Sequence, residues 1–412
     1  MNEPGFHAAG GGLTRGDEIE LVIEKLIAGG DGLGRHERLP VFVPRTAPGD
    51  RARVRVAERK ASYARAEVVE ILAPGPGRRA APCRHFGECG GCDLQHLEDE
   101  RQIAYKVAAT LETLARIGGV ELPAHEVVGG APWGYRTRTR LHVSPPSDGA
   151  PGEPATLGYH GRRSHRIVAV EECPVLVPEL ERAVLELAAT PPAHPPPRID
   201  LAVGDGGELS SAPVARGVPH GDVRVAVGPF AYAFDARCFF QGNRSLLERL
   251  AEVAVGDEGG ELAIDLYAGV GLFALPLASR YARVVAVEGD GVAARYGRIN
   301  ARRNGTGNVE VVHRAVESWI PELPAACDRV VVDPPRPGLA PPILRALVER
   351  RPRTLTYVSC HPAALARDLR ELRTAYEIRA LTLLDLFPQT GHIEIVVQLT
   401  AMPDAAAGDP SP

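Results

Sequence analysis

The sequence predicts a multidomain protein with an N-terminal OB-like β-barrel, a central α+β domain and a C-terminal Rossmann-like α/β domain. A chain of 412 residues is too long for one ordinary domain. Short strand-like segments separated by Gly and Pro turns fill residues 13–72, whereas apolar strands alternate with helical stretches from residue 236 onward. We therefore expect three domains at residues 13–72, 73–235 and 236–400, followed by a disordered tail at 401–412.

The overall composition excludes several classes of protein. The formal net charge is −5, so any surface that binds nucleic acid must be local. No apolar run is long enough to span a membrane, and the first twelve residues lack the pattern of a signal peptide. Seven cysteines, an odd number in a large chain, do not suit a disulfide-stapled secreted domain and favour a reducing cytoplasm.

The barrel is predicted from the N-terminal segment. Residues 18–27 alternate polar and apolar side chains, and a cluster of glycines between residues 29 and 34 marks a turn. Further short strands are expected at residues 40–44, 50–58 and 64–71. Several strands with tight turns in so short a segment are typical of a small barrel.

A cysteine cluster opens the central domain. Five residues separate Cys83 from Cys89 and two separate Cys89 from Cys92, and Cys173 is the natural candidate for a fourth ligand. Thiolates this close in sequence fit a metal or iron–sulfur site, and the spacing alone does not exclude zinc. The next segment, residues 94–117, has helical periodicity, ends at a Gly-Gly pair and is placed to pack against the C-terminal domain.

Two basic segments follow. Arg136, Arg138 and Arg140 alternate with other residues, so on a strand they share one face, next to Trp133 and Tyr135. A second patch contains Arg162, Arg163, His165 and Arg166. Such patches can contact phosphates, although a solvated charged face is the alternative for either of them.

A glycine loop follows the first strand of the C-terminal domain. Gly269 and Gly271 let the backbone approach a ligand closely, and Glu288 ends the next strand, where its carboxylate can accept hydrogen bonds from ribose hydroxyls. A dinucleotide site requires a third glycine, but Ala274 occupies that position. The loop therefore favours S-adenosylmethionine over a nicotinamide cofactor, with a structural turn in another α/β enzyme as the alternative.

A candidate nucleophile and a candidate base lie near the ends of later strands. Cys360 stands in a Ser-Cys-His-Pro turn after an apolar strand, and Glu394 follows downstream. A thiolate that adds to C6 of uracil makes C5 nucleophilic, and a base must then remove the C5 proton. The alternatives are a buried packing role for Cys360 and a solvated strand carboxylate for Glu394.

These motifs together resemble those of the RNA uracil-5-methyltransferases, in particular the enzymes with a TRAM domain that act on 23S rRNA. Residues 13–72 resemble a TRAM domain, and Phe239-Phe240-Gln241-Gly242-Asn243 resembles a segment of that family. The resemblance extends over about residues 13–400. It implies a class I methyltransferase fold for the C-terminal domain and RNA binding by the barrel.

The resemblance also implies roles for individual residues. Cys360 becomes the nucleophile and Glu394 the proton acceptor. Contacts with S-adenosylmethionine are implied for Gln241, Tyr267, Glu288 and Asp333. Ligation of a [4Fe–4S] cluster is implied for Cys83, Cys89, Cys92 and Cys173.

The expected function is S-adenosylmethionine-dependent methylation of uridine C5 in 23S rRNA, through a covalent bond between Cys360 and C6. The expected partner is RNA rather than DNA or a membrane, and the expected state is a cytoplasmic monomer. One alternative is the same reaction on the T loop of tRNA. A radical S-adenosylmethionine enzyme with a TRAM domain would need a Cys-x3-Cys-x2-Cys motif, which differs from the spacing here. A non-enzymatic RNA-binding protein would not need Cys360, Glu394 and the glycine loop together.

Overall fold

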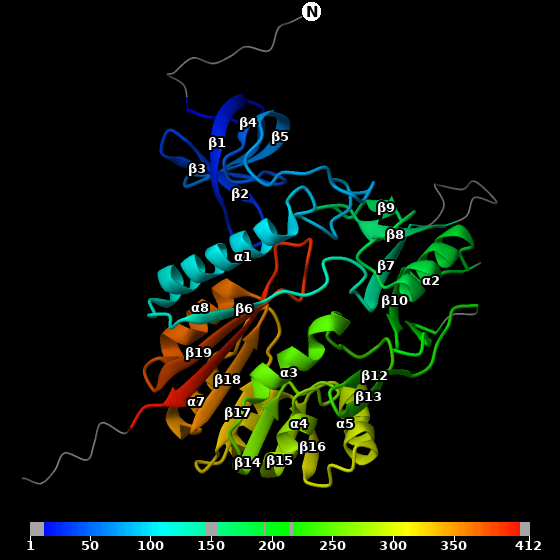
Figure 1. Ribbon diagram of the computed structural model, residues 1–412, viewed down its shortest axis with the longest axis vertical. Coiled ribbons are helices and arrows are strands. Elements are labelled where there is room, and N and C mark those ends of the chain that lie inside the picture. Colours follow the sequence, from blue (N-terminus) through cyan, green and yellow to red (C-terminus); the bar gives the residue numbers. More distant parts are fainter. Residues whose placement is uncertain (1–11, 145–154, 193, 215–216, 404–412) are drawn as a thin grey trace, which may run out of the picture.

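The computed structural model describes residues 12–144, 155–192, 194–214 and 217–403 (Figure 1). Most of the tail predicted at residues 401–412 lies outside these ranges. Within them the chain forms a closed barrel, a five-stranded sheet, a two-stranded sheet and an eight-stranded sheet. No helix in the described ranges is both long and apolar enough to cross a lipid bilayer.

The predicted N-terminal barrel is confirmed. Its strands close in the order β1-β2-β3-β5-β4. They are β1 (Glu18–Leu26), β2 (Gly32–His36), β3 (Leu39–Val43), β4 (Arg51–Arg59) and β5 (Ala64–Ala73). Along β4, buried Ala52, Val54 and Val56 alternate with more exposed side chains, so one face of each strand fills the barrel and the other meets solvent.

The central sheet has the order β11-β10-β7-β8-β9. Its strands are β7 (Arg138–Ser144), β8 (Thr156–His160), β9 (Ile167–Ala169), β10 (Arg198–Val203) and β11 (Leu209–Ala212). Helix α2 (Pro178–Ala189) covers one face, where its buried Leu180 and Val184 join Leu141 and Ile199 in a single core. This region is therefore stabilised by ordinary apolar packing.

The structure contradicts the predicted iron–sulfur centre of the central domain. Cys83, Cys89, Cys92 and Cys173 are free and line one cavity of about 220 Å³. In the ranges that the structure describes, however, no group of three or more His, Cys, Asp or Glu side chains could hold a metal ion. Burial raises the pKa of Cys92 to about 12 and that of Cys173 to about 11. At both positions burial thus favours the neutral thiol. The predicted iron–sulfur centre is corrected because the residues that the structure describes contain no group that could hold a metal ion.

The C-terminal domain is built on the eight-stranded sheet, whose order is β16-β15-β14-β17-β18-β20-β19-β6. The strands are β6 (His125–Val128), β14 (Gly260–Leu266), β15 (Tyr281–Glu288), β16 (Val309–His313), β17 (Arg329–Val332), β18 (Thr354–Ser359), β19 (Tyr376–Leu384) and β20 (Glu394–Ala401). β14 to β18 run parallel, whereas β20 is inserted antiparallel between β18 and β19. The predicted C-terminal α/β fold is confirmed.

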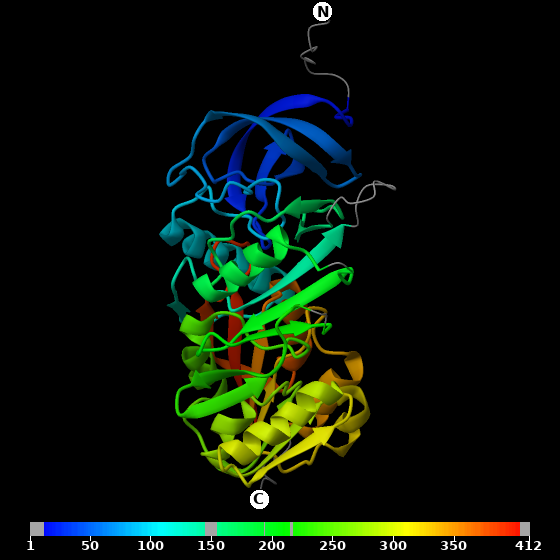
Figure 2. The ribbon, with the colours of Figure 1, turned by 90° about the vertical axis from the view of Figure 1, so that its right-hand side faces the viewer.

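Helices cover both faces of this sheet. The helices are α3 (Leu247–Val255), α4 (Ala274–Ala278), α5 (Gly291–Arg303), α6 (Val316–Trp319), α7 (Pro341–Arg350) and α8 (Pro362–Leu372). The apolar residues of α3, α4 and α5 form one core, and those of α6, α7 and α8 form another. The hairpin of β12 (Val223–Val227) and β13 (Phe230–Phe234) packs into the first core, which joins it to the C-terminal domain (Figure 2).

Helix α1 (Asp99–Thr113) lies between the barrel and the C-terminal domain (Figure 1). It begins later than the helix predicted at residues 94–117, because Leu94 and Leu97 are buried in a separate small core beneath the barrel. The helix continues as a π-helical turn, Leu114–Gly118, and stops at Gly119, which has a left-handed φ of 59°. Beyond it, β6 pairs with β19, so the chain before the central sheet supplies an edge strand to the C-terminal sheet.

Candidate active site

Several of the predicted site residues lie at one edge of the C-terminal sheet. Tyr267 follows β14, Glu288 ends β15, Asp333 follows β17 and Cys360 follows β18. Because these strands are parallel, their carboxyl ends lie side by side, and this is the edge at which open α/β sheets bind ligands. The fold therefore brings together residues that are far apart in the sequence.

The glycine loop after β14 has an unusual backbone. Tyr267, Gly269 and Gly271 have positive φ angles of 64°, 56° and 99°. The Gly269 N–H donates to the Glu288 carboxylate over 2.7 Å, and the Asp290 N–H donates to its other oxygen over 2.6 Å. A Cβ added at Gly269 would meet no atom within 4 Å, so this part of the loop borders open space. Glu288 thus fixes the loop around a space that a ligand can enter.

Asp265, at the end of β14, is a buried carboxylate without a partner. Its side chain is fully buried, and neither oxygen has a hydrogen-bond partner in the described structure. Burial raises its pKa well above the usual value, and the neighbouring Asp333 and Glu288 carboxylates raise it further. An orphaned acid beside two others is a site that a positively charged ligand would satisfy.

Asp333 also interacts with a fourth acid, Glu394. Glu394 is the first residue of β20 and is 1% exposed. Burial raises the pKa of Asp333 to about 7, although Gln241 lowers it by donating a hydrogen bond to the carboxylate. The pKa of Glu394 is raised well above its usual value by burial and then by Asp333. Because the two carboxylates repel each other in a low-dielectric site, one proton is readily kept on the pair.

Cys360 lies next to Glu394. Ser359 pairs with Ile395 in the antiparallel ladder, so Cys360 and Glu394 are the next neighbours along it. The thiol is partly exposed. Burial raises the pKa of Cys360 to about 11 and the Glu394 carboxylate adds to the increase, whereas the Arg336 guanidinium lowers it. Protonation of the nearby acid, with Arg336 in place, would therefore favour the thiolate form of Cys360.

The predicted segment Phe239 to Asn243 also reaches this site. Gln241 is buried and bonds to Asp333, and the Asn243 side chain accepts the Ser245 N–H and donates to the Leu386 carbonyl oxygen over 3.1 Å. Phe239, by contrast, is 70% exposed. An exposed ring beside a polar site is suited to stacking on a base.

A groove of about 510 Å³ runs from the central domain to this site. Its lining includes Arg136, Arg138, Arg140, Phe239, Gln241, Arg336 and His392. Thr137 and Thr139 are buried between the three arginines, so the arginines share the groove face, as the alternation indicated. Arg138 is held by the carbonyl oxygens of Ala236 and Phe240, and Arg140 forms an ion pair with Asp200 over 2.5 Å.

The second predicted basic patch is held in ion pairs within the protein. Arg162 and Arg163 each contact Asp31 of the barrel over 2.6 Å, and Arg166 contacts Glu88 over 3.1 Å. Asp31 is 4% exposed, so these contacts dock the barrel on the central domain. The patch thus has a structural role that its charge alone did not indicate.

Sequence reasoning gave no role to three features in the site or next to it. Asp265 was visible as an acid at a strand end, but its lack of a partner emerges only from the packing. Arg336 contacts His392, with Nη2 and Nε2 separated by 3.3 Å. The third feature is the buried ion pair of Lys106 and Asp385, two residues that are distant in sequence. Long-range contacts of this kind leave no local signal.

Comparison with known proteins gives the same family from sequence and from fold. The family model for tRNA (Uracil-5-)-methyltransferase matches residues 220–402, and the family model for the TRAM domain matches residues 12–69. The 23S rRNA (uracil(1939)-C(5))-methyltransferase RlmD of Pectobacterium atrosepticum is 33% identical, over 91% of this chain and 92% of its own length. The protein of that name from Salmonella paratyphi A is 33% identical, over 96% of this chain and 99% of its own.

A solved structure extends this similarity to three dimensions. The tRNA (uracil-54, C5)-methyltransferase of Pyrococcus abyssi, in complex with S-adenosyl-L-homocysteine, is similar with a TM-score of 0.70 and 25% sequence identity. The match covers 93% of this chain and 100% of that chain. Because curated relatives at 33% identity span nearly the whole chain, the protein belongs to the family of RNA uracil-C5-methyltransferases.

Proposed function

We propose that the protein transfers a methyl group from S-adenosylmethionine to C5 of a uridine in 23S rRNA. The observation that carries the proposal is the grouping of a partly exposed thiol, Cys360, with the coupled acids Asp333 and Glu394 at the sheet edge that bears the glycine loop. The curated relatives that span the chain act on 23S rRNA, which favours rRNA. The Pyrococcus abyssi enzyme acts on tRNA, so tRNA is the second candidate substrate.

The residues at the loop suit S-adenosylmethionine. Asp265 and Asp333 place acidic groups where the ligand's ammonium and sulfonium charges would compensate them. Glu288 is anchored by two backbone N–H groups beside the loop, and its carboxylate would accept hydrogen bonds from the ribose hydroxyls. Tyr267 and Gln241 would complete the site. When bound, S-adenosylmethionine supplies an electrophilic methyl group on its sulfonium.

The protein's own residues would carry the rest of the chemistry. The Cys360 thiolate adds to C6 of uracil, and the electron pair displaced from the C5–C6 double bond makes C5 nucleophilic. After C5 has taken the methyl group, the Glu394 carboxylate removes the C5 proton. The double bond then re-forms and the Cys360 thiolate is expelled. The raised pKa of Glu394 makes its carboxylate a stronger base than an exposed one.

The groove would bring the RNA to this chemistry. Its arginines can contact phosphates, and Phe239 can stack on a base at the entrance. A base inside a duplex cannot reach Cys360 at the sheet edge, so the target uridine must be unpaired or turned out of its stack. The barrel would add a further contact surface for RNA.

A covalent-trapping experiment tests the proposal. We expect the wild-type protein, with S-adenosylmethionine and a 23S rRNA fragment containing 5-fluorouridine, to form a protein–RNA adduct that resists denaturation, because no C5 proton can be removed. Cys360→Ala should form no adduct. With ordinary uridine, Glu394→Gln should accumulate an adduct that wild type does not, and its turnover should fall by roughly 10²- to 10⁴-fold.

Mapping of 5-methyluridine in rRNA and tRNA, with and without the gene, identifies the substrate. Loss of the modification from 23S rRNA supports the proposal, and loss from tRNA alone favours the second candidate. An adduct that persists in Cys360→Ala would show that another residue is the nucleophile.

A further inference from the structure

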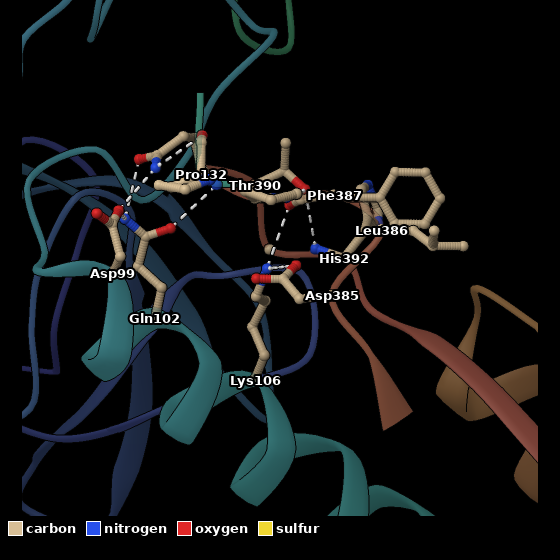
Figure 3. A network of polar contacts seen from close by, with 12 residues as sticks. Asp99, Gln102, Lys106, Pro132, Asp385, Leu386, Phe387, Thr390 and His392 are labelled. Atoms are coloured by element: carbon tan, nitrogen blue, oxygen red, sulfur yellow. Dashed lines mark hydrogen bonds and ion pairs between the residues drawn. The ribbon is translucent and has the colours of Figure 1, made fainter. Parts of the chain in front are cut away.

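The segment between β19 and β20, residues 385–393, leads directly to Glu394 and is held mainly by residues outside the C-terminal sheet. We call it the junction segment. Its first residue, Asp385, accepts a hydrogen bond from Lys106 of α1, with Nζ and Oδ1 separated by 2.5 Å (Figure 3). Lys106 also donates to the Phe387 carbonyl oxygen over 3.2 Å. Both side chains of the ion pair are less than 5% exposed.

A second set of contacts holds the middle of the segment. Gln102, one turn before Lys106 on α1, exchanges two hydrogen bonds with Gln389. Its Nε2 donates to Gln389 Oε1 over 2.9 Å, and its Oε1 accepts the Gln389 N–H over 3.0 Å. Gln389 also donates to Asp99 over 2.8 Å. Gln389 has a φ of 68°, a conformation that a non-glycine residue adopts only where surrounding contacts hold it.

The barrel and the central domain fix the rest of the segment. The Asp93 and Leu94 N–H groups donate to the Gln389 carbonyl oxygen, and the Tyr135 hydroxyl donates to that of Pro388. Gly391 lies against the barrel, where a Cβ added to it would come within 2.3 Å of the Gly29 carbonyl carbon. All three parts of the chain therefore meet at this segment.

The other end of the segment enters the candidate active site. The His392 N–H donates to Thr390, and the His392 ring contacts Arg336, the guanidinium that lowers the pKa of Cys360. Two residues later Glu394 begins β20 beside Cys360. A shift of the junction segment would therefore move His392 and Glu394 relative to the thiol.

We propose that Lys106 and Gln102 are positioning residues for methyl transfer: from α1 they fix the junction segment so that His392 and Glu394 are correctly placed beside Arg336 and Cys360. This inference rests on the proposed role of Glu394. Neither α1 residue belongs to the sheet edge or lines the groove, so their effect acts through the segment. A displacement of about 1 Å at reacting groups can cost on the order of 100-fold in rate.

Kinetics of the full-length protein test the proposal. We expect Lys106→Met and Gln102→Ala to lower kcat by roughly 10- to 100-fold while KM for the RNA changes by less than about threefold. Lys106→Arg, which keeps the charge, should recover part of the loss. Glu112→Gln breaks an ion pair of the same helix with Lys25, at the same 2.5 Å separation but on the surface, and should leave kcat unchanged.

Hydrogen exchange of backbone amides supplies a readout that does not depend on activity. Amides of residues 389–392 should exchange faster in Lys106→Met and Gln102→Ala than in wild type or Glu112→Gln. A folded Gln102→Ala protein with wild-type kcat and wild-type exchange would overturn the inference, even if Lys106→Met failed to fold. Inactive wild-type protein would instead refute the proposed function, and the exchange pattern would still show whether α1 holds the segment.

Discussion

Two buried acids with opposite surroundings mark the limits of the junction segment: Asp385 is its first residue, and Glu394 directly follows its last. Asp385 is paired with Lys106, and each depends on the other: burial lowers the pKa of Lys106 and raises that of Asp385, while their mutual attraction opposes both shifts. Glu394 faces Asp333 instead, so burial and repulsion act in the same direction. An acid paired with a buried cation can hold the backbone in place. An acid beside a second carboxylate has a raised pKa and can act as a proton acceptor in a reaction.

The largest expected effect is on stability at the compensated end. Asp385→Asn leaves the Lys106 ammonium buried without a counter-charge, so we expect the free energy of unfolding to fall by roughly 3–5 kcal/mol. Urea denaturation followed by circular dichroism measures this change. The control Glu310→Gln breaks an exposed ion pair with Arg283, formed over 2.6 Å, and should cost less than about 1 kcal/mol. Equal effects of the two variants would show that burial does not distinguish the pairs.

The pair of Asp333 and Glu394 should make the free energy of unfolding depend on pH. The folded protein binds protons at Asp333 and Glu394 more tightly than the unfolded chain does, so unfolding releases protons above about pH 4. The contribution of this pair to stability is therefore fully present at low pH and is lost as the pH rises through about 7, the folded pKa of Asp333.

The variant Asp333→Asn removes one of the two acids. Between about pH 5 and pH 8 its free energy of unfolding should decline less than that of wild type, by roughly 2–3 kcal/mol. Thermal or urea unfolding at several pH values measures the difference. A parallel decline in the two proteins would mean that Asp333 does not hold a raised pKa.

Much of the fold and of the candidate site was predictable from sequence, because local patterns determine them. Apolar strands that are each followed by or end in a predicted site residue place Tyr267, Glu288, Asp333 and Cys360 at one edge once the strands are parallel. The edge strand β6 was not predicted separately, since its pairing with β19 depends on how distant segments pack.

The features that sequence reasoning missed or misjudged depend on three-dimensional context. Cysteine spacing is local, but whether side chains can surround a metal depends on the folded arrangement, and no such group exists in the described ranges. The sequence predicted that Arg162 and Arg163 can contact phosphates, whereas in the structure both form ion pairs with Asp31 of the barrel. Whether a charge is compensated is thus a tertiary property, which a sequence pattern does not report.

The smallest expected effect applies the same distinction to the groove. Arg140 is paired with Asp200, whereas Arg136 forms no ion pair with a carboxylate in the part of the chain that the structure describes. An arginine without a counter-charge is available to replace a cation on the RNA backbone.

Arg136→Gln should therefore weaken RNA binding by about 1 kcal/mol and reduce the slope of log affinity against log salt by about one. Arg140→Gln should change both less, because Asp200 already satisfies that guanidinium. Binding isotherms at several salt concentrations measure the two slopes. A larger effect of Arg140→Gln would show that the RNA displaces Asp200 from Arg140. Ion pairing in the free protein would then not predict which arginines contact the RNA.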